Sequence, residues 1–270
     1  MTQAAAHLPL PDFRLADPGA HDGIAIQGVS KMFGGKRVLD GLDFVIERGE
    51  TVVIIGRSGE GKSVLLKHIV RLLEPDAGRI WIDGTEITGL ARPELFDMRK
   101  RFGMLFQGAA LFDSLTIAEN LGLGLKEHTA MTPGEIRDRA SECLRMVDLA
   151  GVEDKLPSEL SGGMRKRAGL ARAIVMNPRY ILFDEPTTGL DPITADAIND
   201  LIVMLRSELK VTAIAVTHDM ASAFKIGDRI AMLSRGRIIW ADTVENTRAT
   251  DHPVVRQFVE GRAEGPLTVF

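Results

Sequence analysis

The chain has 270 residues, of which 45% are hydrophobic and 26% are charged, so it is long enough to bury a sizeable core. Its formal net charge is -4 and it has no long basic block, which disfavours a role in nucleic-acid binding. Its longest apolar runs, at 52–55 and 213–216, are strand-sized and far shorter than the ~20 residues that span a bilayer. Its one cysteine, Cys143, can form no internal disulfide, which favours the cytoplasm as the compartment.

The first part of the chain predicts a tail, an antiparallel sheet and a strand followed by a helix. Residues 1–22 lack a basic region followed by a continuous apolar run, so we expect a loosely ordered tail and no signal peptide. Residues 24–46 are short alternating segments broken by glycine-containing turns, which indicates antiparallel strands. Residues 51–55 are a continuous apolar strand, and residues 62–73 predict the helix that comes after it.

The segment between that strand and that helix fits the phosphate-binding pattern G-x-x-x-x-G-K-[ST] at every fixed position. Its backbone N–H groups would surround an anion at the positive end of the helix. Lys62 would neutralise the β- and γ-phosphates of a nucleotide, and Ser63 would offer its hydroxyl to Mg²⁺. We expect the whole segment to bind the nucleotide: Gly56, Arg57, Ser58, Gly59, Glu60, Gly61, Lys62 and Ser63.

The middle of the chain predicts a helical insertion. Strands are expected at 79–82 and 102–106, and Gln107 follows the second of them. Between about 114 and 177 the apolar residues are three and four apart, which indicates helices in place of strands. One apolar stripe of this kind contains Ile136, Ala140, Cys143, Leu144 and Val147, so Cys143 is expected to be a buried small hydrophobe.

Strands return at 180–183 and 212–217, and the helix between them indicates a parallel sheet covered on both faces. Asp184 and Glu185 stand at the end of the first strand, and His218 follows the second. The carboxyl ends of parallel strands meet at one edge of a sheet, where open α/β folds bind ligands. We therefore expect these three side chains at a ligand site.

The segment Leu160-Ser161-Gly162-Gly163-Met164 lies between the phosphate loop and the acidic strand end. Its serine predicts a helix N-cap, and its glycines allow a backbone to approach closely, which makes a second anion site. With all three segments, residues 24–240 resemble the ATP-binding cassette (ABC) ATPases. The resemblance implies an α/β fold: a RecA-like P-loop core, an antiparallel β subdomain and the helical insertion, together spanning residues 23–241.

The resemblance also implies roles for single residues. Glu185 is then the general base that polarises the attacking water, and Asp184 is a partner of Mg²⁺. Gln107 is the Q-loop residue that touches Mg²⁺ and water, and His218 is the switch histidine that contacts the γ-phosphate. Phe33 matches the aromatic residue that stacks on adenine, although core packing is the alternative for a phenylalanine.

Two further implications concern assembly. Ser161, Gly162 and Gly163 of one subunit would close on the nucleotide of another, with Asp191 in the adjoining D-loop, so the complete unit would be a homodimer that uses ATP and Mg²⁺. The segments 106–115 and 252–261 resemble those of Mla-type and Mce-associated lipid-transport ATPases. That implies a motor for phospholipid transport at a bacterial inner membrane, serving outer-membrane lipid asymmetry.

Membrane permease subunits would then dock near residues 107–115, where exposed Leu111 and Phe112 would receive them; packing against the core is the alternative for both side chains. A small cytoplasmic accessory subunit and a periplasmic lipid-binding subunit are further partners that the resemblance implies. The extension at 242–270 predicts a short amphipathic helix that buries its apolar face on a neighbouring subunit or on its own core. That face would contain Val254, Val255, Phe258 and Val259.

Three other functions are open to a chain with a phosphate loop. One is the ATPase of an importer for a small polar solute. Another is a non-transport ABC ATPase of translation or DNA repair, but those usually have two cassettes, long coiled-coil arms or zinc-binding cysteine clusters, and this chain has one cassette and one cysteine. A P-loop kinase would explain neither the segment at Ser161 nor the base at Glu185.

Overall fold

A computed structural model describes residues 10–267 of the chain. Contacts divide it into two compact units. Among the described residues, the first contains 10–89 and 217–267, and the second is Leu90–Val216. Within residues 10–267, none of the helices combines the length and the hydropathy that a membrane span requires.

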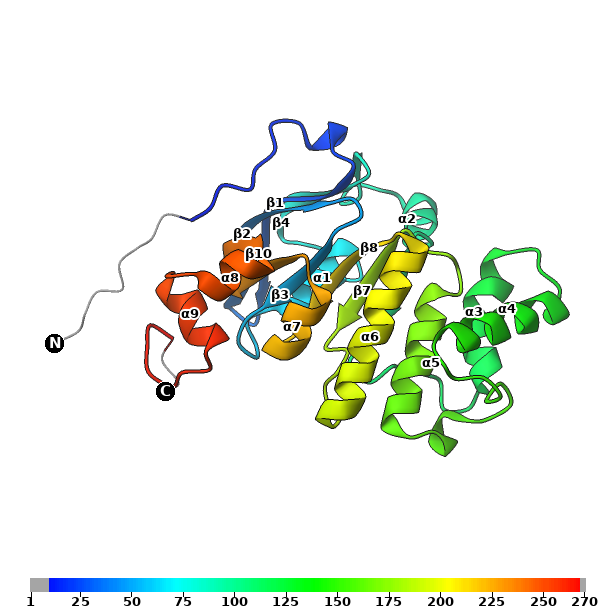
Figure 1. Cartoon of the computed structure of the whole chain (residues 1–270). Coiled ribbons are helices and arrows are strands. Elements are labelled where there is room, and N and C mark those ends of the chain that lie inside the picture. Colours follow the sequence, from blue (N-terminus) through cyan, green and yellow to red (C-terminus); the bar gives the residue numbers. More distant parts are fainter. Residues whose placement is uncertain (1–9, 268–270) are drawn as a thin grey trace. The chain divides into compact units, whose positions relative to one another are not determined.

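The first unit contains the predicted antiparallel sheet, in which the strand order is β2-β1-β4-β5 (Figure 1). Its strands are β1 (Gly23–Phe33), β2 (Lys36–Glu47), β4 (Ala77–Ile82) and the short β5 (Thr85–Glu86). Ile24 pairs with Ile46 on one side and with Ile82 on the other, and all three side chains are fully buried. Cross-strand aliphatic contacts of this kind stabilise the sheet.

The same unit contains the strand that leads into the phosphate loop. β3 (Thr51–Ile55) pairs in parallel with β9 (Arg229–Ser234), which pairs antiparallel with β10 (Arg237–Thr243). Every residue of β3 is buried, which explains its continuous apolar sequence. The helix after the loop, α1 (Lys62–Ile69), is shorter than the predicted 62–73. It stops because Arg71 takes a left-handed conformation (φ 49°) and the Leu72 N–H donates back to Lys67 O, a helix-ending pattern.

The second unit contains the parallel strands β6 (Phe102–Leu105), β7 (Tyr180–Asp184) and β8 (Thr212–Val216), in the order β8-β7-β6. The predicted strands at 102–106, 180–183 and 212–217 are thus confirmed. The helix between β7 and β8 is α6 (Pro192–Leu209). The spacing predicts one apolar face, of which Leu209 is half-buried and the other four residues are buried: Ile198, Leu201, Ile202 and Leu205. A helix that the apolar pattern did not reveal, α2 (Arg92–Arg99), precedes β6.

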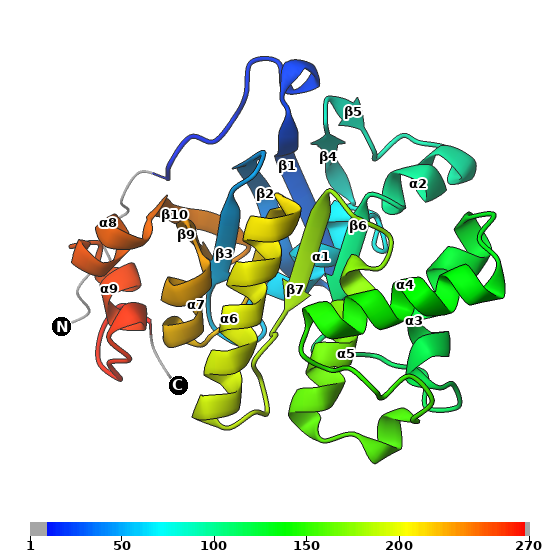
Figure 2. The same ribbon diagram turned by 45° about the vertical axis from the view of Figure 1, so that its right-hand side comes forward.

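Three helices of the second unit confirm the predicted insertion. They are α3 (Ile117–His128), α4 (Pro133–Met146) and α5 (Gly162–Ile174), and they pack against one another (Figure 2). Thr116 and Thr132 begin α3 and α4 with capping boxes. The stripe on α4 is buried as expected: Ala140, Cys143, Leu144 and Val147 have no exposed surface, and Ile136 is half-buried.

Residues 10–22 lie against the antiparallel sheet. The Phe13 ring packs edge-on against Phe44 at 5.3 Å, and Arg14 Nε donates to Asp43 Oδ2 at 2.9 Å. Gln27 Nε2 donates to the Leu15 carbonyl at 2.8 Å. The rest of the predicted tail, residues 1–9, lies outside the described residues.

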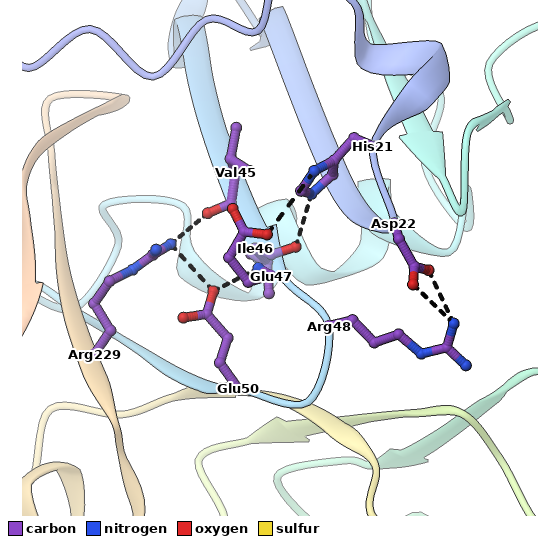
Figure 3. Close-up of polar contacts among 8 residues, drawn as sticks. All are labelled: His21, Asp22, Val45, Ile46, Glu47, Arg48, Glu50 and Arg229. Atoms are coloured by element: carbon purple, nitrogen blue, oxygen red, sulfur yellow. Dashed lines mark hydrogen bonds and ion pairs between the residues drawn. The ribbon is translucent and has the colours of Figure 1, made fainter.

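A polar cluster joins the end of this segment to β2 and β9 (Figure 3). His21 Nε2 lies 3.1 Å from the Ile46 carbonyl oxygen, and Arg48 donates to both carboxylate oxygens of Asp22 at 3.0 Å. Arg229 bridges the Val45 carbonyl and the carboxylate of Glu50. Burial raises the pKa of Glu50 against the effect of this arginine. The cluster is a set of paired charges that fixes the turn before β3.

The C-terminal extension contains α8 (Val244–Ala249) and α9 (Pro253–Val259). It packs on β10 and on α7 (Met220–Ile226), which belong to its own unit. Trp240 Nε1 donates to Thr247 Oγ1 at 3.0 Å, and the Arg248 guanidinium lies 4.0 Å from the Phe224 ring centroid. Val255 is fully buried, as one of the two alternatives requires. The other residues of its predicted apolar face are half-buried: Val254, Phe258 and Val259.

Candidate functional site

The phosphate loop connects β3 to α1 in a conformation that only glycine adopts easily. Gly56 has φ 154° and Gly61 has φ 100°. A Cβ atom on Gly56 would lie 2.4 Å from Leu233 O, and one on Gly61 would lie 2.8 Å from Val38 Cγ1. Both positions therefore exclude any other residue, for backbone and for steric reasons.

Lys62 lies over this loop. Its Nζ donates to the carbonyls of Gly56 at 2.7 Å and Arg57 at 3.1 Å, and the residue is only 7% exposed. The N-cap of α1 is Gly61, which has no side chain to accept from the first helical N–H groups. A buried cation beside the uncapped start of a helix is suited to binding phosphate. Glu60 fixes the loop to the turn between β9 and β10, because its Oε2 accepts a hydrogen bond from Arg235 N at 2.6 Å.

Two more predicted residues belong to the first unit. Phe33 ends β1 and is 43% exposed, with Lys31 Nζ 5.6 Å from its ring centroid. Phe33 therefore lies outside the buried core, and stacking on adenine stays a prediction. His218 is exposed and directly precedes Asp219, whose carboxylate accepts from Ala221 N and caps α7.

In the second unit, the acidic pair stands at the carboxyl end of β7. Asp184 is 6% exposed and Glu185 is 9% exposed. Glu185 has a left-handed backbone (φ 49°), its N–H donates to Val216 O at 2.9 Å, and its carboxylate accepts from Thr188 Oγ1 at 3.0 Å. Strained backbone at a buried carboxylate is common at functional sites, where the surroundings hold the residue in one geometry.

Ser161, in the segment 160–164, caps α5 as predicted. Ser161 Oγ accepts from Met164 N at 3.3 Å, and Ser161 and Gly162 are both exposed. A Cβ on Gly163 would lie 2.8 Å from Thr194 Cγ2, so this glycine permits close contact with the start of α6. Asp191 caps α6 and accepts from Thr194 Oγ1 at 2.5 Å; this bond and those from two backbone N–H groups hold the pKa of Asp191 below its ordinary value.

The segment after β6 places Gln107 and Phe112 at the surface. Gln107 is exposed, Leu111 is half-buried and Phe112 is 56% exposed, which argues against core packing for Phe112. Asn120 holds the backbone of Phe112 through two hydrogen bonds, at 2.7 and 3.1 Å. A groove beside this segment is lined mainly by apolar side chains, among them Phe102, Met104, Phe106, Phe112 and Met176.

Sequence reasoning missed Lys166, on α5. Its Nζ donates to the main-chain carbonyls of Gln107 and, at 3.1 Å, of Glu185, and the residue is 5% exposed. Burial lowers the pKa of Lys166, although the carboxylates of Asp184 and Glu185 favour its charged form. Its partners lie 59 and 19 residues away in the sequence, so no local pattern could have revealed this contact.

Comparisons with known proteins identify the family of the chain. A family model described as "ABC transporter" matches residues 39–188. The chain is 43% identical to the probable ribonucleotide transport ATP-binding protein mkl of Mycobacterium leprae, over 90% of this chain and 70% of that protein. It is 38% identical to the intermembrane phospholipid transport system ATP-binding protein MlaF of Escherichia coli K12, over 90% of this chain and 91% of that protein.

A solved structure supports the fold. The dimeric post-hydrolysis state of the ATP-binding cassette MJ0796, bound to ADP and Pi, has a TM-score of 0.75 and 35% identity, covering 82% of this chain and 98% of that one. The mixed antiparallel and parallel strands therefore form the nucleotide-binding fold that the sequence predicts. The chain belongs to the ABC transporter family and is one of its ATP-hydrolysing ATPases.

Proposed function

We propose that this ATPase powers a transporter that moves phospholipids between the inner and outer membranes of a bacterium. One observation carries the proposal: the 38% identity to MlaF extends over 91% of the length of that phospholipid transport protein. The mkl proteins are more similar, at 43%, and their name refers to ribonucleotide transport. The alternative cargo is therefore a small polar solute, and the experiment must distinguish it from a phospholipid.

For the hydrolytic step we propose a role for each predicted residue. Lys62 and the backbone N–H groups of 56–63 bind the ATP phosphates, and Phe33 stacks on adenine. Glu185 takes a proton from the attacking water, which raises its nucleophilicity. His218 contacts the γ-phosphate, and Gln107 orients the water.

The residues present fit a magnesium ion. Mg²⁺ takes oxygen ligands and keeps several waters, so one or two protein side chains and the substrate phosphates complete its shell. The Ser63 hydroxyl, the Gln107 side chain and the buried Asp184 carboxylate would hold it, and the bound ion would neutralise phosphate charge.

The proposed active assembly is a homodimer on the cytoplasmic face of the inner membrane. Ser161, Gly162 and Gly163 offer an exposed helix start to the nucleotide of the second copy, beside Asp191. The groove next to Phe112 is proposed to receive the membrane permease subunits at 107–115. A small accessory subunit and a periplasmic lipid-binding subunit complete the proposed transporter.

The cargo is tested by purifying the assembly from native membranes through a tag on this chain and identifying bound small molecules by mass spectrometry. Phospholipid is expected in the assembly, together with ATP-dependent transfer of a fluorescent phospholipid between liposomes. A bound ribonucleotide or other polar solute, without lipid transfer, would contradict the proposal. Glu185→Gln serves as the control because it should retain ATP and abolish transfer.

The composite site is tested with mixed dimers. In a heterodimer of Lys62→Ala and a Ser161 variant, both lesions fall on one site and the other site stays intact. Partial recovery of ATP hydrolysis over either variant alone is expected. No recovery in demonstrated heterodimers would show that Ser161 does not act across the dimer.

A further inference from the structure

We propose that Lys166 is a positioning residue for ATP hydrolysis, whose ammonium group ties the backbone of Gln107 to the backbone of Glu185. The inference rests on the roles proposed above for these two residues. Lys166 itself lies in α5, the helix that Ser161 caps.

The hydrogen bonds of Lys166 go to main-chain atoms. Its Nζ donates to the carbonyl oxygens of Gln107 and Glu185, which belong to the segments after β6 and after β7. Burying an ammonium group costs several kcal/mol unless strong partners replace its water. Here the partners are two carbonyls and the nearby carboxylates of Asp184 and Glu185. Because burying a cation is unfavourable, its placement between Gln107 and Glu185 points to a role in positioning these two residues.

Three residues that accept hydrogen bonds from α5 have left-handed backbone conformations. Glu185, Ala109 and Ala110 all have left-handed conformations, with φ of 49°, 62° and 49°. Each costs about 1 kcal/mol or more for a residue other than glycine. A cation of α5 binds each of their carbonyls: Lys166 binds that of Glu185, and Arg172 binds those of Ala109 and Ala110 at 2.7 and 2.6 Å. The helix therefore supplies hydrogen bonds to the left-handed residues of both segments.

Two glycines bring α5 close enough for these contacts. A Cβ on Gly103 in β6 would lie 2.0 Å from the Ala173 carbonyl oxygen, far inside contact distance. A Cβ on Gly169 would lie 2.6 Å from Leu105 Cδ1 and 3.2 Å from the Ala109 Cβ. Close approach of helix and strand at these two points places the Lys166 side chain between the two loops.

The consequence is a rigid connection within one unit. Lys166 lies five residues after Ser161, about 7.5 Å along the helix axis. A displacement of the Gln107 backbone is therefore transmitted through one ammonium group to the backbone of Glu185, and the exposed Ser161 caps the same helix. Removing the connection should misplace the base without removing any group that binds ATP.

The test compares three variants in the tagged assembly purified from native membranes. Lys166→Met keeps the apolar stem and removes both hydrogen bonds, and we expect kcat to fall about tenfold or more, because positioning groups have effects of this size. The KM for ATP should stay within twofold. Lys166→Arg keeps donors for both carbonyls and should recover most of kcat.

Arg139→Met is the matched structural control. Arg139 is also mostly buried, and it donates to the carbonyls of Val175 and Ile174 at 3.1 and 3.3 Å, at the opposite end of α5. Its loss should lower the melting temperature and leave kcat within twofold. If Lys166→Met does not fold, Lys166→Gln replaces it, since the shorter amide cannot reach both carbonyls and the same loss of kcat is expected.

An unchanged kcat in the folded Lys166 variant overturns the proposal, as does an equal loss in Arg139→Met. Glu185→Gln in the same preparation separates this result from the function proposed above. If Glu185→Gln keeps wild-type turnover, the base assignment fails. If Glu185→Gln is inactive while Lys166→Met is normal, only the positioning role of Lys166 fails.

Discussion

Lys62 and Lys166 are both buried lysines near the start of a helix, and each donates to two main-chain carbonyls. The acceptors of Lys62 are five and six residues away and belong to its own loop. Those of Lys166 belong to two other segments of the second unit. One lysine thus contacts its own loop, while the other connects two separate loops.

The difference teaches where function can be recognised in a sequence. A loop that closes on itself leaves a pattern of fixed spacing, because its glycines and its lysine must follow each other at set intervals. A lysine that joins distant segments leaves no such pattern, since its partners are backbone atoms that any residue provides. Its role is visible only from the contacts.

The largest expected effect comes from Lys62→Ala. The phosphates would lose their principal countercharge, so we expect turnover to fall about a hundredfold or more and ATP binding to weaken at the same time. Steady-state hydrolysis and binding of a fluorescent ATP analogue measure the two effects. Lys166→Met should differ by keeping normal ATP binding, and equal binding losses in both variants would remove the distinction between the two lysines.

The second prediction concerns the approach of α5 to β6. Gly103→Ala places a methyl group 2.0 Å from the Ala173 carbonyl oxygen, and overpacking of this kind destabilises proteins by about 1–3 kcal/mol. We also expect a lower kcat, because the displaced helix carries Lys166. Urea unfolding measures the stability, and Gly134→Ala, where a Cβ meets nothing within 4 Å, is the control.

Much of the fold and of the site follows from the sequence. Apolar runs and alternation predict the strands, and the spacing on α4 predicts its buried stripe, because each pattern reports which face must leave water. The Ser161 cap is equally local. The short β5 and the helix α2 escape prediction because they carry no strong apolar period, and the early end of α1 depends on the conformation of Arg71. Lys166 and Arg172 escape because their partners are distant carbonyls.

The third prediction is that the C-terminal extension contributes to stability and not, as the two lysines do, to ATP binding or hydrolysis. Ending the chain after Thr243, at the end of β10, exposes Trp240, which loses its bond to Thr247 and its contact with the His252 ring. It also removes the buried Val255. We expect a lower melting temperature of the isolated subunit with an unchanged KM for ATP. Normal stability combined with a loss of self-association would favour the intersubunit role that the sequence leaves open.

The smallest expected effect is the alkaline loss of stability caused by Cys143, which lies on α4 and touches neither lysine network. Burial raises the pKa of its thiol from 9.0 to about 11. Below about pH 8 the thiol is neutral in both folded and unfolded chains, so its contribution to stability is complete. Between pH 9 and about 11 the unfolded chain releases the proton while the folded chain retains it, which lowers the free energy of unfolding by about 1 kcal/mol at pH 10. The stability difference between wild type and Cys143→Ala should therefore be constant up to pH 8 and shift in favour of the variant above pH 9. Parallel curves in urea unfolding from pH 7 to 10.5 would show that the thiol is less buried in solution than its fully enclosed position on α4 indicates.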